Sequence, residues 1–367
     1  MALQRIRSFA FSFVPKHWHR LILTRQLRLW VPPTSPELLP DVVKGAVTKV
    51  TRGVGFSVGY SDSSPLLWFW GEDPPISGGG RGMLEEVSLP RGQLVKQVSV
   101  GRRHVVVLTT SGEVFSMGLN CFGQCGFPLS PSPSSPGNLL PLQPLHTPSP
   151  VVKVCCGLDH THFLTSEGLL YSCGWSDDGQ TGTGCRGSLA TPTRVAGDVM
   201  TERVRDVQCC ADTSLAITES SGGIYGWGNN EYRQLHIESS DMQVFEPWKV
   251  NLLPNQSDAG EVVAMTIGSS FSATLTERGD IYVAGRLGGR EKGGEGWGLL
   301  HDSGSRSNEE VVDVKAGLHY LAALVREGKG HQRLLLWGRH STKTPPLADP
   351  HEMELPSSHP ELGRRSS

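Results

Sequence analysis

The segment from Tyr171 to Gly184, YSCGWSDDGQTGTG, has the composition of a chemical site. It holds one cysteine, one tryptophan, two adjacent aspartates and four glycines within fourteen residues. A site of this kind occurs once in a chain, whereas architecture recurs. The choice between the two interpretations therefore depends on whether the same spacing is found elsewhere in the sequence.

The spacing does recur. In Val98–Gly126 and Val152–Gly182, a glycine is followed three residues later by histidine, then by Leu-Thr, a glycine, an aromatic residue, another glycine and finally Gly-Gln-x-Gly. Weaker copies share this frame, and six units are recognisable at spacings of 48 to 58 residues. Their origins are Gly53, Gly101, Gly157, Cys210, Gly268 and Gly317.

Each unit has the pattern of antiparallel strands. Alternating apolar residues such as Val152, Val154 and Cys156 indicate a half-buried strand, and Ser111-Gly112-Glu113 is typical of a tight turn. One small sheet buries only one face, but sheets stacked around a circle bury both. The sequence therefore predicts an all-β fold, a β-propeller with six recognisable blades within residues 40–339.

The repeat gives most of the opening segment a structural role. We expect its recurring glycines and histidines to shape the blades, and these residues are Gly101, His104, Gly157, His160, Gly174, Gly228, Gly268 and Gly317. The loop that follows the third strand varies between copies, and varying loops on a rigid scaffold carry binding specificity. The candidate interaction residues are Asp177, Asp178, Asn229, Asn230, Glu231 and Tyr232.

Other motifs do not indicate catalysis. GFSVG (55–59) fits a nucleophile elbow and GTGCRG (182–187) fits a nucleotide loop, but neither lies in the strand-to-helix setting that its chemistry requires. The eight cysteines form no C-x-x-C pair, which favours buried free thiols over a metal site. We predict no enzyme activity, no cofactor and no metal; a propeller hydrolase is a remote alternative.

Charge divides the chain into unlike parts. Residues 1–36 hold six basic residues and no acid, which predicts a mitochondrial transit peptide; the alternative is a divergent first strand in Ser8–Pro15 followed by a basic connector. The remainder carries 28 basic against 36 acidic residues, a net of −8. No apolar run approaches the roughly 18 residues of a membrane span.

Two further segments depart from the blade pattern. Residues 127–150 contain eight prolines in 24 residues, which predicts a projecting loop or arm between units. Residues 340–367 are polar and proline-rich, which predicts a disordered tail.

The motifs Gly-x-x-His, Leu-Thr, Trp-Gly and Gly-Gln-x-Gly resemble the regulator-of-chromosome-condensation repeat family, over Val47 to about Arg339. Within it, the segments VFSMGLNCFGQCG, YSCGWSDDGQTG and GIYGWGNNEYRQL are similar to a mitochondrial branch. The resemblance implies a seven-bladed propeller in the mitochondrial matrix or at the inner membrane. The chain departs from it in having six units and no matching exchange wedge, so ring closure by the N-terminal segment, a six-bladed ring and a truncated sequence all stay open.

The resemblance implies two functions. The first is nucleotide exchange on a dynamin-like mitochondrial GTPase of inner-membrane fusion, in which acidic loops such as Asp177-Asp178, Asp212 and Glu231 compete with phosphate or disturb the magnesium site. The second is a scaffold role with mitochondrial ribosomal RNA or its modification factors. Phosphate binding needs clustered cations, here Arg102-Arg103 or Arg286, Arg290 and Lys292, and the net charge of −8 favours protein partners instead.

Overall fold

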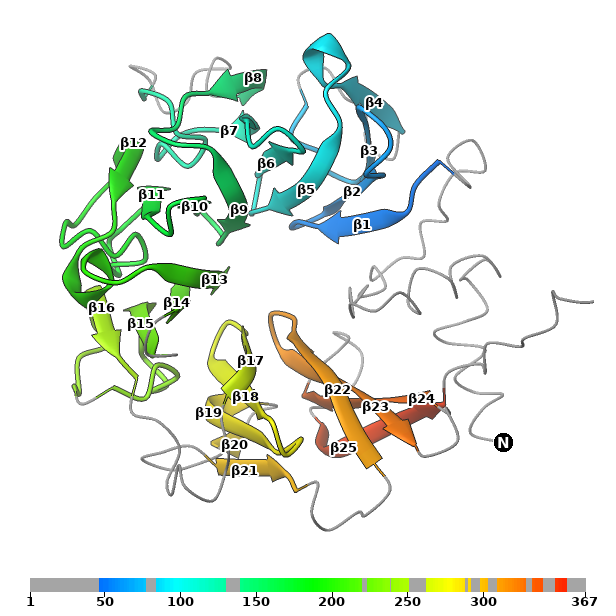
Figure 1. Ribbon diagram of the computed structural model, residues 1–367, viewed down its shortest axis with the longest axis vertical. Coiled ribbons are helices and arrows are strands. Elements are labelled where there is room, and N and C mark those ends of the chain that lie inside the picture. Colours follow the sequence, from blue (N-terminus) through cyan, green and yellow to red (C-terminus); the bar gives the residue numbers. More distant parts are fainter. Residues whose placement is uncertain are drawn as a thin grey trace, which may run out of the picture.

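Six small antiparallel sheets are arranged around a common centre in the computed structural model (Figure 1). The structure describes residues 46–76, 84–129, 139–219, 223–237, 239–250, 262–287, 290–291, 298–302, 309–327, 332–338 and 347–354. The transit-peptide prediction for residues 1–36 lies outside this range. The fold is an all-β propeller, as the repeat pattern predicts.

The first three blades each take four strands that are consecutive in the chain. Blade 1 comprises β1 (Lys49–Arg52), β2 (Phe56–Tyr60), β3 (Leu66–Gly71) and β4 (Glu85–Ser88). Blade 2 comprises β5 (Val95–Val100), β6 (His104–Thr109), β7 (Val114–Leu119) and β8 (Leu139–Leu145). Blade 3 comprises β9 (Val151–Cys156), β10 (His160–Thr165), β11 (Leu170–Gly174) and β12 (Leu189–Arg194).

The last three blades follow the same plan. Blade 4 comprises β13 (Val204–Cys210), β14 (Thr213–Thr218), β15 (Ile224–Asn229) and β16 (Gln243–Lys249). Blade 5 comprises β17 (Val262–Ile267), β18 (Phe271–Thr276), β19 (Ile281–Leu287), β20 (Arg290–Glu291) and β21 (Gly298–His301). Blade 6 comprises β22 (Glu309–Ala316), β23 (Tyr320–Glu327), β24 (Gln332–Gly338) and β25 (Leu347–Glu354).

Helix is nearly absent from these ranges. Two 3₁₀ turns occur, η4 (Pro90–Gly92) and η6 (Gly197–Met200). In the part of the chain that the structure describes, no helix has the length and apolar character needed to cross a bilayer.

The second strand of each blade is buried on both faces. Every residue of β6, β10, β14 and β18 is buried. Stacked blades cover such a strand from both sides, so apolar and polar side chains on it are buried alike. The buried polar residues need partners, because an unpaired buried donor or acceptor is costly; His104 finds one in the next blade and Thr109 finds one in its own hairpin.

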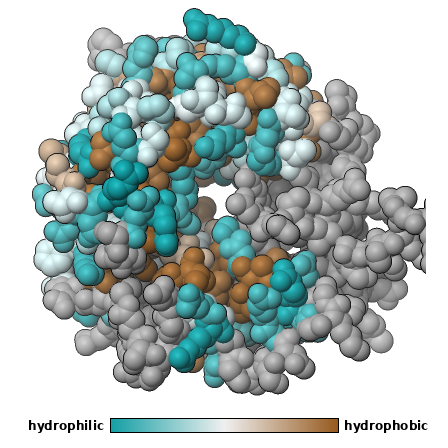
Figure 2. All heavy atoms as spheres, in the orientation of Figure 1, coloured by the Kyte–Doolittle hydropathy of each residue, from teal (hydrophilic) through white to brown (hydrophobic). Residues whose placement is uncertain are grey.

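Consecutive blades meet through their innermost strands. The first strand of each blade packs against the two inner strands of the blade before it: β5 on β1 and β2, β9 on β5 and β6, β13 on β9 and β10, β17 on β13 and β14, and β22 on β17 and β18. On the face of the propeller shown in Figure 2, polar and apolar side chains are interspersed.

Two predictions about irregular segments were wrong. Leu139–Leu145, inside the proline-rich insertion, forms β8 and pairs with β7. Pro141 and Pro144 are tolerated there because an outermost strand needs hydrogen bonds along only one edge. Leu347–Glu354, inside the predicted disordered tail, forms β25 and pairs with β24. Residues 130–138 and 355–367 lie outside the described ranges.

Candidate interaction face

One end of the propeller carries all of the candidate loops. In an antiparallel blade, the hairpin between the first two strands and the loop after the third strand lie at the same end of the strands. The two are joined by a recurring hydrogen bond from the third-strand end to the hairpin. These bonds are Leu119 N–H to the Arg103 carbonyl at 2.7 Å, Trp175 to Asp159 at 2.8 Å and Asn229 to Asp212 at 2.8 Å. We call this end the loop face.

Gly174 and Gly228 close the third strand where no side chain fits. Their φ angles are +109° and +94°, in the region that favours glycine. A Cβ on Gly174 would lie 2.4 Å from the Asp159 carbonyl oxygen, and one on Gly228 would lie 2.2 Å from that of Asp212. These glycines therefore serve the shape of the blade.

Gly101 and Gly157 have a different steric reason to be glycine. The side chain three residues later folds back over each of them, so a Cβ would lie 2.1 Å from His104 Cε1 in blade 2 and 2.0 Å from His160 Cε1 in blade 3. The same arrangement recurs with other rings, since Gly268 lies under Phe271 and Gly317 under Tyr320. Blade 4 is the exception, since Cys210 and Thr213 occupy the two positions there.

His104 and His160 use their remaining nitrogen to reach the next blade. His104 Nε2 lies 3.0 Å from Thr161 Oγ1, and His160 Nε2 lies 3.2 Å from Ser214 Oγ. Both imidazoles are fully buried, and burial lowers the pKa of His104 to about 3. Each histidine therefore joins two blades through a hydrogen bond. A buried, neutral imidazole in this position does not act as a general base on a substrate.

The Gly-Gln motif folds the variable loop back on itself. The side-chain Oε1 of each motif glutamine accepts a hydrogen bond from the backbone N–H two residues earlier in the chain. The pairs are Gln124 with Phe122 at 2.9 Å, Gln180 with Asp178 at 3.0 Å and Gln234 with Tyr232 at 3.0 Å.

The six candidate interaction residues fall into two groups. Asn230 is buried and holds the loop, because its Oδ1 accepts from Leu235 N–H at 3.1 Å and its Nδ2 donates to the Asp241 carbonyl at 3.0 Å. Asp178 and Asn229 tie two blades together: Asn229 Nδ2 donates to Asp178 Oδ2 at 3.1 Å. The remaining three are accessible to a partner. Asp177 is half-buried, Glu231 is exposed and Tyr232 is 38% exposed.

Contacts between neighbouring loops join them into a continuous band. The ring of Phe122 on blade 2 meets Trp175 on blade 3 at 4.5 Å between centroids. Blade 3 meets blade 4 through Asp178 and Asn229, and the guanidinium of Arg286 on blade 5 lies 5.8 Å from the centroid of Tyr232 on blade 4. We call these six residues the loop belt. Three belt residues, Phe122, Trp175 and Arg286, were missing from the sequence-based interaction candidates. Arg286, at the end of β19, had been considered only as part of a phosphate patch.

Carboxylates accompany the belt on its inner side. Burial raises the pKa of Asp159 in spite of the Arg102 guanidinium, whose Nε lies 2.9 Å from Asp159 Oδ2. Burial also raises the pKa of Asp212, although its Oδ1 accepts from Gln180 Nε2 at 3.0 Å. Arg103, the second cation of the sequence-predicted phosphate patch, pairs with Asp73 at 2.9 Å. The charges of Arg102 and Arg103 are therefore largely matched within the protein.

These features define a class of protein, a β-propeller that presents a rigid band of loops for binding. The Regulator of chromosome condensation (RCC1) repeat matches residues 95–124 and 151–180 and, in a second form, residues 111–164, 167–217 and 221–275. The crystal structure of human WBSCR16 is similar with a TM-score of 0.70 and 30% identity, covering 84% of this chain and 82% of that one. The chain belongs to the RCC1 repeat family.

Curated relatives agree with this assignment. The RCC1-like G exchanging factor-like proteins of Mus musculus and Homo sapiens are 36% and 34% identical, over 68% of this chain. The chain spans about half the length of these relatives, 54% in each case. The yeast structure of Prp20p, described with its binding properties to Gsp1p and histones, has a TM-score of 0.62 at 18% identity, covers 78% of this chain and 70% of that one, and supports the fold alone.

Proposed function

We propose that this protein is a non-catalytic binding protein whose loop face engages a mitochondrial GTPase and promotes nucleotide release. The observation that carries the proposal is the loop belt. Its contacts fix loops of blades 2 to 5 relative to one another, so Asp177, Glu231 and Tyr232 are presented together on a rigid support. The names of the curated relatives, which include an exchanging factor-like function, point the same way.

Exchange of this kind requires no catalytic residue. A surface that binds the nucleotide-free GTPase more tightly than the loaded form lowers nucleotide affinity by the same factor, because the two binding equilibria are linked. Carboxylates beside the nucleotide pocket repel phosphate and compete for magnesium. Asp177 and Glu231 are placed to act in this way on the partner's surface.

The alternative function is a scaffold for mitochondrial ribosome assembly. Direct RNA binding requires cations that are free to neutralise phosphates. Arg102 and Arg103 are instead paired with Asp159 and Asp73. On this alternative, the protein joins ribosomal particles through protein partners, and its association survives ribonuclease.

Mitochondrial import forms part of the proposal and is supported by the acid-free basic segment of residues 1–36. Fusion of residues 1–40 to a reporter protein tests it: we expect import into isolated mitochondria that depends on the membrane potential. A matched fusion with Arg5, Arg7, Arg20 and Arg25 changed to glutamine should not be imported. Equal behaviour of the two fusions would contradict the assignment.

Affinity capture from isolated mitochondria, with and without ribonuclease, separates the two functions. We expect a GTPase to be recovered in both conditions and to be lost with a loop-face variant, Asp177→Lys/Glu231→Lys. The matched control is Glu167→Lys/Glu277→Lys, which makes the same charge change at exposed turns of the opposite end. Recovery of ribosomal factors alone, with no GTPase in either condition, would overturn the exchange proposal; the scaffold alternative predicts that these factors are recovered even after ribonuclease.

A further inference from the structure

The interface between blades 3 and 4 differs from the other interfaces of the propeller. Where blade 3 has His162 on its second strand, the equivalent residues of the other blades are apolar: Val58, Val106, Leu215, Ala273 and Ala322. His162 is fully buried and does not occupy the ring-over-glycine position, which His160 fills. The repeat therefore accounts for His160 but not for His162, which contacts Ser214 at 2.9 Å and the Trp227 ring at 5.4 Å between centroids in blade 4.

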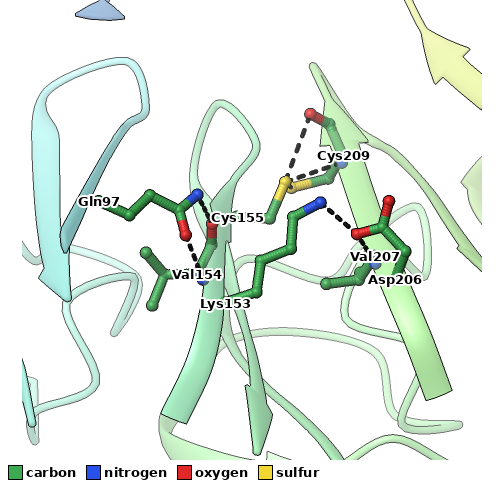
Figure 3. Close-up of polar contacts among 7 residues, drawn as sticks. All are labelled: Gln97, Lys153, Val154, Cys155, Asp206, Val207 and Cys209. Carbon is green, nitrogen blue, oxygen red and sulfur yellow. Dashed lines mark hydrogen bonds and ion pairs between the residues drawn. The ribbon is translucent and has the colours of Figure 1, made fainter. Parts of the chain in front are cut away.

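Two cysteines face each other across the same interface. Cys155 on β9 and Cys209 on β13 point toward one another, with 3.0 Å between their sulfur atoms (Figure 3). Register pairs His162 with Cys155 in blade 3 and Cys209 with Ser214 in blade 4. Since laterally paired residues share a sheet face, all four side chains project into the space between the two blades.

These groups have the identities and spacing of metal ligands. The ligand atoms of His160, His162 and Cys209 all lie within 4.8 Å of one another. Ligands of a tetrahedral zinc ion, with bonds of about 2.0 Å to nitrogen and 2.3 Å to sulfur, lie about 3.3–3.8 Å apart. Side-chain rotation has to bring the three atoms to that separation. Cys155 is outside this group of three, but its sulfur lies 3.0 Å from that of Cys209, which makes it the candidate for a fourth ligand.

The two imidazoles converge on one hydroxyl group. Both histidines direct Nε2 at Ser214 Oγ, at 3.2 and 2.9 Å, while that hydroxyl donates to the Gln180 carbonyl at 3.2 Å. Nδ1 of His160 packs against Gly157, where a Cβ would lie 2.4 Å from it. Nε2 is therefore the nitrogen of His160 that can coordinate a metal, in place of its contact with Ser214.

The interface is not sealed at its two cysteines. The backbone N–H and the thiol of Cys209 each lie 3.0 Å from Cys155 Sγ. Both cysteines lie on innermost strands and are only partly buried, which gives an ion a route of entry.

We propose that His160, His162, Cys155 and Cys209 bind one zinc ion, which joins blade 3 to blade 4. Two imidazoles and two thiolates form the ligand set of structural zinc sites. On binding, each thiol that is still protonated releases its proton to solvent. Three ligands come from the hairpin of β9 and β10, and Cys209 on β13 lies 47 residues beyond His162, so the set matches no zinc motif.

Other blades of the same chain supply matched substitutions. Thr266 and Ser99 occupy the Cys155 position and accept the N–H of the next blade, from Ala316 at 2.8 Å and Cys156 at 2.9 Å. Cys155→Ser therefore keeps that hydrogen bond and removes a ligand. By the same logic Cys209→Ala copies Ala316, and His162→Val copies Val106. These variants should fold, and His104→Phe, which copies Phe271, is the control that leaves all four ligands intact.

The test is zinc titration of the full-length protein, purified with a reductant and freed of metal by dialysis, with stoichiometry from elemental analysis. We expect one zinc per chain, a rise in Tm on zinc addition, and a thiolate-to-metal charge-transfer band when cobalt(II) replaces zinc. Each ligand variant should lose zinc affinity by about tenfold or more, and His104→Phe should not. Absence of stoichiometric zinc in folded protein would overturn the proposal, as would zinc binding that persists unchanged in both His162→Val and Cys209→Ala.

Discussion

The imidazole of His160 lies directly over the backbone of Gly157, so closely that a Cβ on the glycine would sit 2.0 Å from the ring. The ring both fills the hairpin of its own blade and reaches Ser214 of the next blade through Nε2. In this blade, one residue pair therefore links the bend within the blade to the attachment between blades.

Gly157→Ala should destabilise the fold by about 2–3 kcal/mol, since the added Cβ would overlap the His160 ring and would also lie 2.6 Å from the Ala211 carbonyl oxygen, and overpacking a core costs this much. Gly92→Ala is the control: its φ of +66° strains a side chain, but nothing lies within 4 Å of the added Cβ. We expect about 1 kcal/mol there. Urea unfolding of both variants measures the difference, and equal losses would show that steric contact with His160 is not the cause.

His104→Phe should weaken the dependence of stability on pH. In the folded protein burial lowers the pKa of His104 to about 3, from 6.5 in the unfolded chain. As the pH falls from 6.5 towards 3, only the unfolded chain takes up this proton, so wild-type stability declines in that range. The variant should show a slope smaller by up to about 1.4 kcal/mol per pH unit. Urea unfolding between pH 7 and pH 4 measures it, and an unchanged slope would contradict the buried neutral histidine.

Gln180→Leu should cost more stability than Gln124→Leu at the equivalent position. In both glutamines, Oε1 accepts a hydrogen bond from a backbone N–H of the same loop. Nε2 of Gln180 also donates to Asp212 Oδ1 at 3.0 Å. Nε2 of Gln124 is buried without a hydrogen-bond partner. Loss of the donor leaves a largely buried carboxyl group unsatisfied, a penalty of about 1–3 kcal/mol. Thermal unfolding of the two variants compares them. Equal losses would mean that the contact with Asp212 contributes nothing.

The repeat made most of the fold predictable. The spacing of glycines and rings in the two clear copies defined the repeat, and each weaker copy forms a blade with the same strand order. What the repeat did not predict were the outermost strands, because a strand with one free edge tolerates prolines and polar residues. Composition therefore placed Leu139–Leu145 in a projecting loop and Leu347–Glu354 in a disordered tail, whereas both pair with their blades.

The candidate site was predictable in position and less so in detail. The variable loops mark the loop face, but which side chains are committed to neighbours depends on contacts between blades. Asp178 and Asn229 stand 51 residues apart and meet only because the repeat places their loops side by side. The same geometry brings Cys209 to Cys155 and His162, which are themselves paired within one hairpin.

Recognition of a GTPase by the loop face is the central proposal. Nucleotide release from the captured GTPase tests this proposal most directly. Release of a fluorescent guanine nucleotide would be followed with wild-type protein, with Asp177→Lys/Glu231→Lys/Tyr232→Ala, and with the opposite-end control Glu167→Lys/Glu277→Lys. We predict that wild type and control accelerate release alike, and that the loop-face variant loses at least about fivefold of the acceleration while keeping its Tm. Equal acceleration by the loop-face variant, or none by the wild type, would contradict the central claim.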